Sequence, residues 1–96
     1  MSKFKIGQTV IINTNPDYLI SIGYKKDGNS FVHPNYDSIP LQMQNLDTKI
    51  TNIIEINNAH HKGTHYQVLL DNDEYNWPPL VLFPIDSEYG KFLYGT

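Results

Sequence analysis

The sequence predicts a mostly β domain, either a small barrel or a sandwich. Apolar segments of strand length recur along the chain, turns rich in Gly, Pro and Asn separate them, and no amphipathic helical pattern is present. Ala, the best helix former, occurs only at Ala59, whereas Ile and Tyr, which favour strands, are frequent. The 96 residues suffice for one modest core and leave no room for a second domain.

The first third of the chain is predicted to hold a strand and a hairpin. Residues 4–13 read as a strand because Val10-Ile11-Ile12 is an apolar run of strand length. Residues 18–26 and 30–33 flank Asp27-Gly28-Asn29. Since Asp-Gly between β-prone segments is a frequent hairpin turn, we expect these two segments to pair.

The middle of the chain is predicted to contain one helical turn and the clearest strand. Residues 40–46 have the length and apolar spacing of a single helical turn. Residues 49–56 carry four isoleucines, and the adjacent Ile53 and Ile54 break strict alternation. That break predicts a β-bulge or a strand buried on both faces.

The last third is predicted to supply the closing strands and a tail. Apolar alternation covers residues 66–70, a short strand is expected at 75–77, and 81–85 is the last apolar segment. Residues 86–96 form a tail that either adds an edge strand or stays mobile and binds a partner by strand addition. We therefore expect one domain over residues 1–85, followed by the tail.

Four segments carry patterns typical of one family of small barrels. Phe4-Lys5-Ile6-Gly7-Gln8-Thr9-Val10 has the opening pattern hydrophobic–x–hydrophobic–Gly–polar–x–Val. Thr51-Asn52-Ile53-Ile54-Glu55-Ile56 and His65-Tyr66-Gln67-Val68 follow as second and third strands. Tyr75-Asn76-Trp77, followed by Leu80 and Leu82, has the pattern of the closing segment. In these features the chain resembles small SH3-like β-barrel proteins of bacterial and phage type, and more distantly mind-bomb-like barrels.

The resemblance implies an SH3-like barrel of about five strands, with a long first loop or hairpin and a short helical turn. It covers residues 4–13 and 47–85. Residues 14–46 depart from the family pattern because they are longer than its usual first loop. A segment of that length invites a functional explanation.

The charge balance disfavours a dedicated nucleic-acid binder. The net charge is −3, and all seven basic residues are Lys, so the chain lacks the Arg side chains that usually contact phosphates and guanine edges. The absence of Cys excludes disulfides, thiolate metal sites and thiol chemistry. No apolar run has the length of a membrane span, and Met1-Ser2-Lys3 leads directly into patterned sequence, so we expect a cytoplasmic protein without a membrane partner.

Histidines and acidic residues are possible metal ligands, but neither group supports a metal or another cofactor here. His60, His61 and His65 could share a ligand sphere, but no carboxylate lies at a telling spacing. Solvated histidines in a polar turn are the favoured alternative. Asp71-Asn72-Asp73-Glu74 begins like a calcium loop, yet Asn76 and Leu82 stand where such a loop needs Gly and Glu.

The sequence also predicts a protein that is not an enzyme. The four serines that follow the first two residues lie in no nucleophile-elbow context, and the chain has no Gly-rich phosphate loop. A core this small leaves little room for a shaped pocket.

Aromatic side chains are the better candidates for a functional surface, because Tyr and Trp bury large areas at low rotamer cost. For Trp77 a place in the core is the favoured alternative. The candidate partner-binding residues are Tyr18, Tyr24, Asp27, Tyr36, Tyr66, Tyr75 and Trp77.

From these features we expect a non-enzymatic protein–protein interaction module. The resemblance implies a phage or mobile-element accessory protein that binds and inhibits a host protein, with residues 14–46, and especially the hairpin tip at 27–29, in the contact. One alternative is a nucleic-acid-associated barrel with a lysine-rich face made of Lys3, Lys5, Lys25, Lys26 and Lys49. Another is a structural subunit that pairs through the apolar edge at residues 80–85. The sequence leaves the oligomeric state open.

Overall fold

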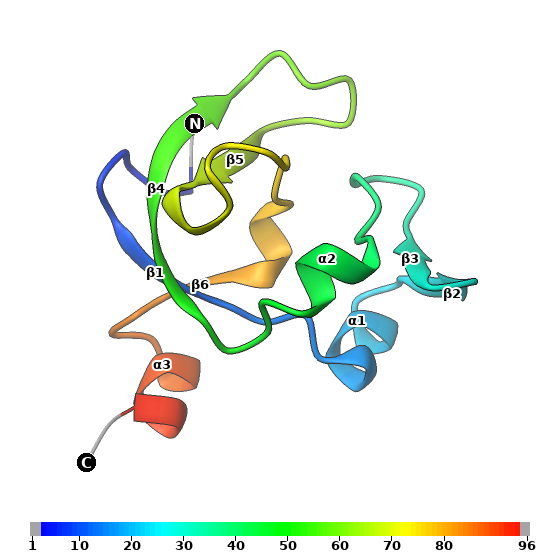
Figure 1. Ribbon diagram of the computed structural model, residues 1–96, viewed down its shortest axis with the longest axis horizontal. Coiled ribbons are helices and arrows are strands. Elements are labelled where there is room, and N and C mark those ends of the chain that lie inside the picture. The colour runs from blue at the N-terminus through cyan, green and yellow to red at the C-terminus, as the bar shows by residue number, and fades with distance from the viewer. Residues whose placement is uncertain (1–2, 95–96) are drawn as a thin grey trace.

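The computed structural model describes residues 3–94. Residues 1–2 of the predicted domain and 95–96 of the predicted tail lie outside the described residues. Residues 3–94 form six strands, three short α-helices and two 3-10 turns, and the longest strand, β4, curves across the molecule (Figure 1). In chain order the elements are β1 (Thr9–Ile12), α1 (Pro16–Ser21), β2 (Lys25–Asp27), β3 (Ser30–Val32), α2 (Leu41–Gln44), β4 (Ile50–Asn57), β5 (His65–Val68), η1 (Leu69–Asp71), η2 (Pro79–Val81), β6 (Leu82–Pro84) and α3 (Glu88–Tyr94).

The main sheet is antiparallel and has the strand order β5-β4-β1-β6. Its register pairs Val10 with Thr51 of β4 and with Pro84 of β6. The pairing between β4 and β5 shifts register between Ile53 and Glu55, which confirms the irregularity predicted from the paired isoleucines.

The fold is mixed rather than mostly β, because strand takes up 29% and helix 25% of the structure. Within residues 3–94 the sheet does not close into a barrel. A closed barrel needs its two edge strands to pair, and here four strands form an open sheet. At one edge, β6 is three residues long and ends at Pro84, which has no N–H to donate. At the other edge, residues 75–77 were expected to form a short strand. They pair with β5 only through an isolated bridge between Trp77 and Tyr66.

Trp77 is fully buried and is the largest residue of the core. Its indole N–H donates to the Oδ2 atom of Asp71 over 2.8 Å, so the polar edge of the ring is satisfied inside the protein. The alternative that Trp77 fills the core is therefore confirmed. The rest of the core cluster comes from the sheet and from the early segment; its members are Phe4, Val10, Ile12, Leu19, Tyr24, Phe31, Ile39, Met43, Ile53, Tyr66, Val68, Val81 and Leu82.

Residues 14–46 form ordered structure that contributes to this core. The expected strand over residues 18–26 begins instead as helix α1, because the Asn15 side chain accepts the backbone N–H groups of Asp17 and Tyr18 and caps the helix. Pro16 at the first turn suits this geometry, and Gly23, with a φ of 103°, ends the helix.

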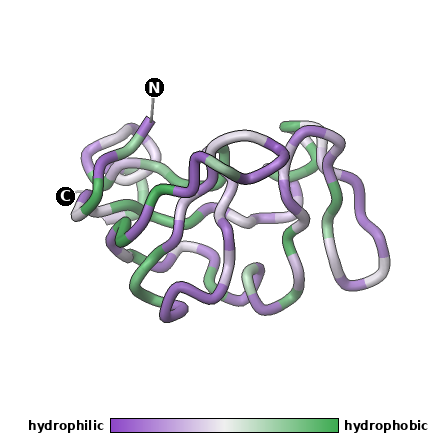
Figure 2. Tube along the Cα trace, turned by 90° about the horizontal axis from the view of Figure 1, so that it is seen from above, coloured by the Kyte–Doolittle hydropathy of each residue, from purple (hydrophilic) through white to green (hydrophobic). Residues whose placement is uncertain are grey.

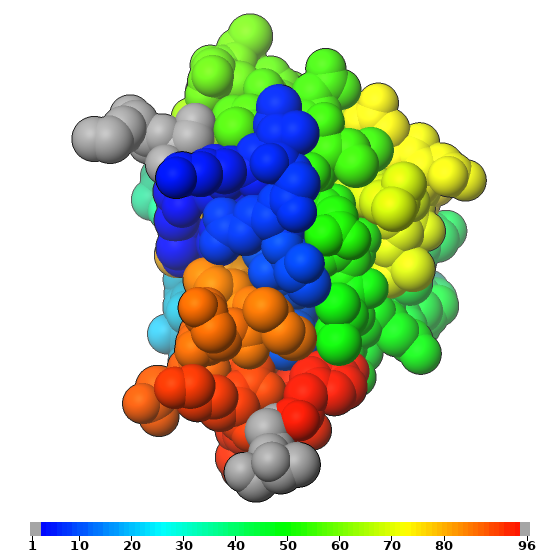
Figure 3. All heavy atoms as spheres, turned by 90° about the vertical axis from the view of Figure 1, so that its left-hand side faces the viewer, coloured from blue at the N-terminus to red at the C-terminus, as the bar shows by residue number. Residues whose placement is uncertain are grey.

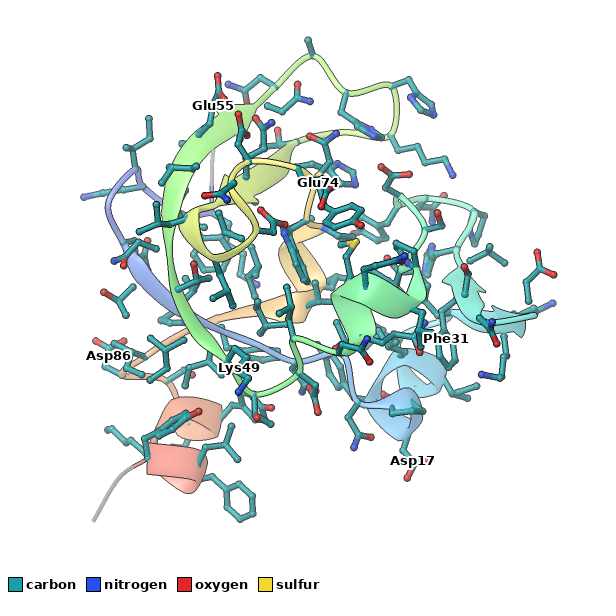
Figure 4. The ribbon with its side chains drawn as sticks, viewed as in Figure 1. Asp17, Phe31, Lys49, Glu55, Glu74 and Asp86 are labelled. Atoms are coloured by element: carbon teal, nitrogen blue, oxygen red, sulfur yellow. The ribbon has the colours of Figure 1, made fainter. Side chains whose placement is uncertain are left out.

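The predicted hairpin and helical turn are both present in this segment. Strands β2 and β3 pair from Lys25 to Val32 through Asp27 and Ser30, as the Asp-Gly turn predicted. Phe31 of β3 points inward between β3 and α2 (Figure 4), while Met43 anchors α2 in the core.

The tail is largely helical, so neither an edge strand nor a mobile segment describes residues 88–94. Helix α3 lies below the segment that leads into β1, beside β6 (Figure 3). Tyr89 packs on Phe83 with ring centroids 5.0 Å apart, and the Tyr94 hydroxyl donates to the backbone carbonyl of Thr48.

Hydrophilic and hydrophobic stretches are interspersed along the trace of residues 3–94 (Figure 2). Among residues 3–94, none of the helices has both the length and the apolar character needed to cross a bilayer.

Candidate functional site

The structure divides the predicted partner-binding residues between the core and the surface. Tyr24 and Trp77 are buried, so a partner cannot reach their rings in this conformation. Tyr18 is half-buried and donates its hydroxyl to the carbonyl of Leu80 over 2.6 Å, and burial raises its pKa. Tyr75 is half-buried, and Asp27 is exposed at the hairpin tip.

Tyr66 is as buried as Tyr24 and Trp77, but it and the half-buried Tyr36 both line one surface feature, a cleft described below. The ring of Tyr66 is buried against Phe4, with centroids 5.1 Å apart. Its hydroxyl accepts the backbone N–H groups of Lys3 and Phe4 over 2.8 and 3.3 Å.

A continuous row of aromatic rings joins residues 24–36 to the turn between β4 and β5. We call this row the aromatic seam. Successive ring centroids lie 4.9, 5.0, 6.2, 4.0 and 4.6 Å apart. In order, its members are Tyr24, His33, Tyr36, His65, His60 and His61.

His65, at the centre of the seam, is buried and held as one neutral tautomer. The backbone N–H of Asp37 donates to its Nε2 atom over 3.1 Å, so that nitrogen carries the lone pair. Its Nδ1 atom lies 3.0 Å from the carbonyl oxygen of Gly63 and therefore donates to it. Burial lowers the pKa of His65, because the charged ring would lose its hydration.

His60 is held in the same manner. Its Nδ1 atom accepts the backbone N–H of Lys62 over 3.0 Å, which leaves Nε2–H to donate to the Asp37 carboxylate over 3.2 Å. Both nitrogens of His60 and of His65 are thus already hydrogen-bonded, and a metal ion would have to displace these bonds. Within residues 3–94, the His, Cys, Asp and Glu side chains form no group of three placed to hold a metal ion.

His33 connects the seam to the end of α1. Its Nε2 atom donates to the carbonyl oxygen of Ile22 over 3.0 Å, and its Nδ1 atom accepts the N–H of Asn35 over 3.0 Å. Through hydrogen bonds to backbone groups, the seam histidines therefore connect the end of α1, the 33–37 loop and the β4–β5 turn.

The seam borders a cleft of about 400 Å³ between the 33–37 loop, the β4–β5 turn and η2. We call this the Lys3–Lys62 cleft. Tyr36, Pro79 and Leu80 supply apolar walls, Tyr66 lines its base, and polar groups come from both sides. Its full lining is Lys3, Asn35, Tyr36, Lys62, Gly63, Thr64, Tyr66, Pro79 and Leu80.

The cleft is positively charged although the chain is acidic overall. Lys62 Nζ donates to the carbonyl oxygen of Tyr36 over 3.2 Å, and Lys3 Nζ lies 3.4 Å from that of Pro79. No carboxylate lines the cleft, and among the described residues no Lys ammonium lies within 4 Å of a carboxylate. Backbone carbonyls therefore hold both ammonium groups while leaving their charge uncompensated.

The other lysines do not extend this positive surface into a continuous track. Lys25 and Lys26 are on β2, at the opposite side of the molecule from the segment that carries Lys5 (Figure 1). Lys49 lies at the lower end of β4, away from both (Figure 4). These lysines therefore do not gather on one face of the molecule (Figures 1 and 4).

A second hollow of about 450 Å³ lies at the base of the β2–β3 hairpin. It is lined by Gly23, Lys25, Val32, His33 and Pro34, and it shares no lining residue with the Lys3–Lys62 cleft. With one lysine and mainly apolar walls, it offers fewer groups that could orient a ligand.

Sequence reasoning missed most of the cleft. Lys62, Thr64 and Asn35 lie in segments read only as polar turns or irregular chain. The single signal available was the lysine within residues 57–63, an otherwise uncharged turn that carries two histidines. The contacts that form the cleft join residues 26 or more positions apart, so no local pattern records them.

Fold and site define a small mixed α/β domain with one electropositive, aromatic-lined cleft. Comparison with protein-family models, with curated proteins and with solved structures found no match to this chain.

Proposed function

We propose that this chain is a non-enzymatic protein-binding module, and that its partner docks at the Lys3–Lys62 cleft. The observation that carries the proposal is the cleft itself, in which two lysines without carboxylate partners flank an aromatic and apolar lining. Interfaces typically combine such aromatic anchors with a polar rim.

The chemistry of the lining supports binding rather than catalysis. The residues that line the cleft include no carboxylate, imidazole or serine. The hydroxyl of Tyr66 and the ammonium groups of Lys3 and Lys62 are already hydrogen-bonded to backbone groups rather than to a base that could activate them. The Thr64 hydroxyl donates to Asn58 Oδ1 over 3.1 Å and so is already engaged. What remains are donors and apolar surface.

The way in which the cleft is held also favours a docking role. The aromatic seam fixes the 33–37 loop against the β4–β5 turn, and Lys62 ties the same two segments together through Tyr36. A surface that is ordered before its partner arrives loses less entropy on binding. The length of residues 14–46 is thereby explained, because this segment supplies one wall of the cleft.

Selection from a displayed random-peptide library tests the proposal, with affinities of the selected peptides then measured by calorimetry. We expect Lys62→Glu to weaken binding by at least about tenfold, since it reverses a charge inside the cleft. Lys91→Glu is the matched control, because it makes the same charge change on an exposed face of α3. Equal affinities for the two variants would contradict the proposal.

Lys62 also contacts the 33–37 loop, so each variant is first compared with the parent chain by urea unfolding. A replacement of the hairpin tip at residues 27–29 by another Gly-containing turn separates the two candidate surfaces. Because the tip does not line the cleft, we expect the peptides to bind this variant normally. That the natural partner is a host protein of a phage or mobile element stays a prediction from the resemblance.

A further inference from the structure

We infer that the Lys3–Lys62 cleft recognises the side-chain carboxylate of an aspartate or glutamate in the partner protein. The inference rests on the proposed function, since the acidic residue belongs to the docked protein. It specifies which chemical group the cleft selects and which atoms of this chain bind it.

The two ammonium groups supply the charge complementarity. Lys3 and Lys62 enter the cleft from the N-terminal segment and from the β4–β5 turn, so a ligand between them meets a positive group on either side. Each ammonium carries three donor hydrogens, and the carbonyl contacts of Lys62, to His33 and Tyr36, use two of them. An acceptor-only group such as a carboxylate matches these free donors.

The hydroxyl of Tyr66 is a third donor. Its two acceptor positions are occupied by the backbone N–H groups of Lys3 and Phe4, so its own hydrogen is directed elsewhere. Among the described residues no acceptor lies within hydrogen-bond distance of that hydrogen, and Tyr66, although only 1% exposed, is one of the residues that line the cleft. Two incoming N–H donors also polarise the hydroxyl and strengthen it as a donor.

The backbone of the cleft indicates a side-chain carboxylate rather than a chain terminus. Terminal carboxylates are usually captured by nests of free backbone N–H groups. Here most of those groups already have acceptors within the protein. Those of Tyr36, Thr64 and Leu80, for which none is found among the described residues, are not successive in the chain and so form no nest. The N–H of Lys3 binds Tyr66, that of Asn35 binds His33, and those of Lys62 and Gly63 both bind His60.

The same lining is less suited to a phosphate group. Lysine binds phosphate only as a point charge, whereas bidentate recognition of a phosphate group uses Arg, and the chain contains no Arg. Two lysines and a phenol hydroxyl instead provide three separate donors for the two oxygens of a carboxylate. The apolar walls at Tyr36 and Leu80 accommodate the methylenes of an acidic side chain.

Amide NMR titration of the full chain tests the inference with four probes. They are the blocked peptide acetyl-Gly-Glu-Gly-amide, its Gln counterpart, tri-glycine with a free carboxyl terminus, and inorganic phosphate. We expect saturable shifts at residues 62–66 with the Glu peptide that weaken as salt is added. We expect none at those residues with the other three probes.

Lys62→Gln and Lys3→Gln should each lower the affinity for the Glu peptide by about tenfold. This factor corresponds to the loss of one charge-assisted hydrogen bond at a partly exposed site. Lys91→Gln should leave it unchanged. Tyr66→Phe removes the third donor while keeping the ring, and we expect it to weaken binding as well.

Equal shifts with the Gln peptide, or shifts at residues 62–66 with phosphate or tri-glycine but not with the Glu peptide, would overturn the inference. An absence of shifts with the Glu peptide would overturn it too. In that case, if library peptides still bound in a manner that depends on Lys62, the proposed docking function would stand. Failure of the carboxylate inference is therefore distinguishable from failure of the proposed function.

Discussion

Replacing Gly90 by Ala is expected to destabilise the protein, although the same change stabilises most helices. Gly90 lies within α3, where Ala exceeds Gly in helix propensity by about 1 kcal/mol. A Cβ atom at this position would stand 2.1 Å from the carbonyl oxygen of Ile85 and 3.1 Å from that of Pro84. Both are backbone atoms, which cannot swing aside as the end of a side chain can.

The least costly relief is for α3 to move off β6. That movement gives up the packing of Tyr89 on Phe83, worth about 1 kcal/mol for an aromatic pair, and the Tyr94 hydrogen bond, worth about 1 kcal/mol. Forced overpacking without movement costs a similar 1–3 kcal/mol, roughly. After subtracting the propensity gain, we expect the free energy of unfolding to fall by about 1 kcal/mol.

Urea unfolding followed by circular dichroism measures this change. For a domain of this size the midpoint should drop by roughly 0.5–1 M. Phe92→Ala is the matched control in the same helix, since its side chain is 81% exposed and its removal should change the stability by less than about 0.5 kcal/mol. A Gly90→Ala protein more stable than the parent would refute the packing of α3 described above.

Three further predictions concern local strain, a buried hydrogen bond and pH. Thr48 has a φ of 67°, which a β-branched residue tolerates poorly, so Thr48→Asn should raise the free energy of unfolding by about 0.5–1 kcal/mol; an unchanged urea midpoint would count against it. Asp71→Ala leaves the buried Trp77 N–H without an acceptor and should lower stability by about 1–3 kcal/mol, with an altered Trp fluorescence maximum; parental stability would contradict it. His65 has a pKa below 6.5 in the folded state, so its contribution is complete above pH 6.5 and declines as the pH falls below that value, where the unfolded chain binds the proton more readily. Urea midpoints at pH 7.5 and 5.5 test this, and loss of any difference in His65→Gln would assign it to this ring; a midpoint that rises on acidification would contradict it.

The strand elements were predictable because their signals are local. The apolar run at residues 10–12, the isoleucines of β4 and the Asp27-Gly28 turn each act within a few residues of chain. The bulge between Ile53 and Glu55 was visible as a break in alternation. In these places the local pattern and the packing agree.

The helices and the open sheet were harder to foresee for identifiable reasons. Helix α1 depends on the cap by Asn15, which the sequence also permits as a turn former. Gly90 lowers the helix propensity of α3, but its missing side chain is what allows the helix to approach Ile85. Whether a sheet closes is decided by pairing between its edge strands, and here that pairing is absent within the described residues.

The sequence predicted the type of residue that forms the candidate site, but not most of its individual residues. Aromatic residues were expected to form the functional surface, and Tyr36 and Tyr66 do line the cleft. The rings of Trp77, Tyr24 and Tyr66 itself lie in the core, because a small domain uses its largest rings to exclude water. The lysine pair is set by contacts between residue 62 and the 33–37 loop, which only the folded chain brings together.

The central claim is that partners dock at the Lys3–Lys62 cleft. Amide hydrogen exchange of the full chain, measured with and without a peptide obtained by library selection, tests it most directly. We predict added protection at residues 33–37 and 60–66, with the exchange of the β2–β3 hairpin and of α3 unchanged. Protection confined to the hairpin or to α3, with none at residues 60–66, would contradict it.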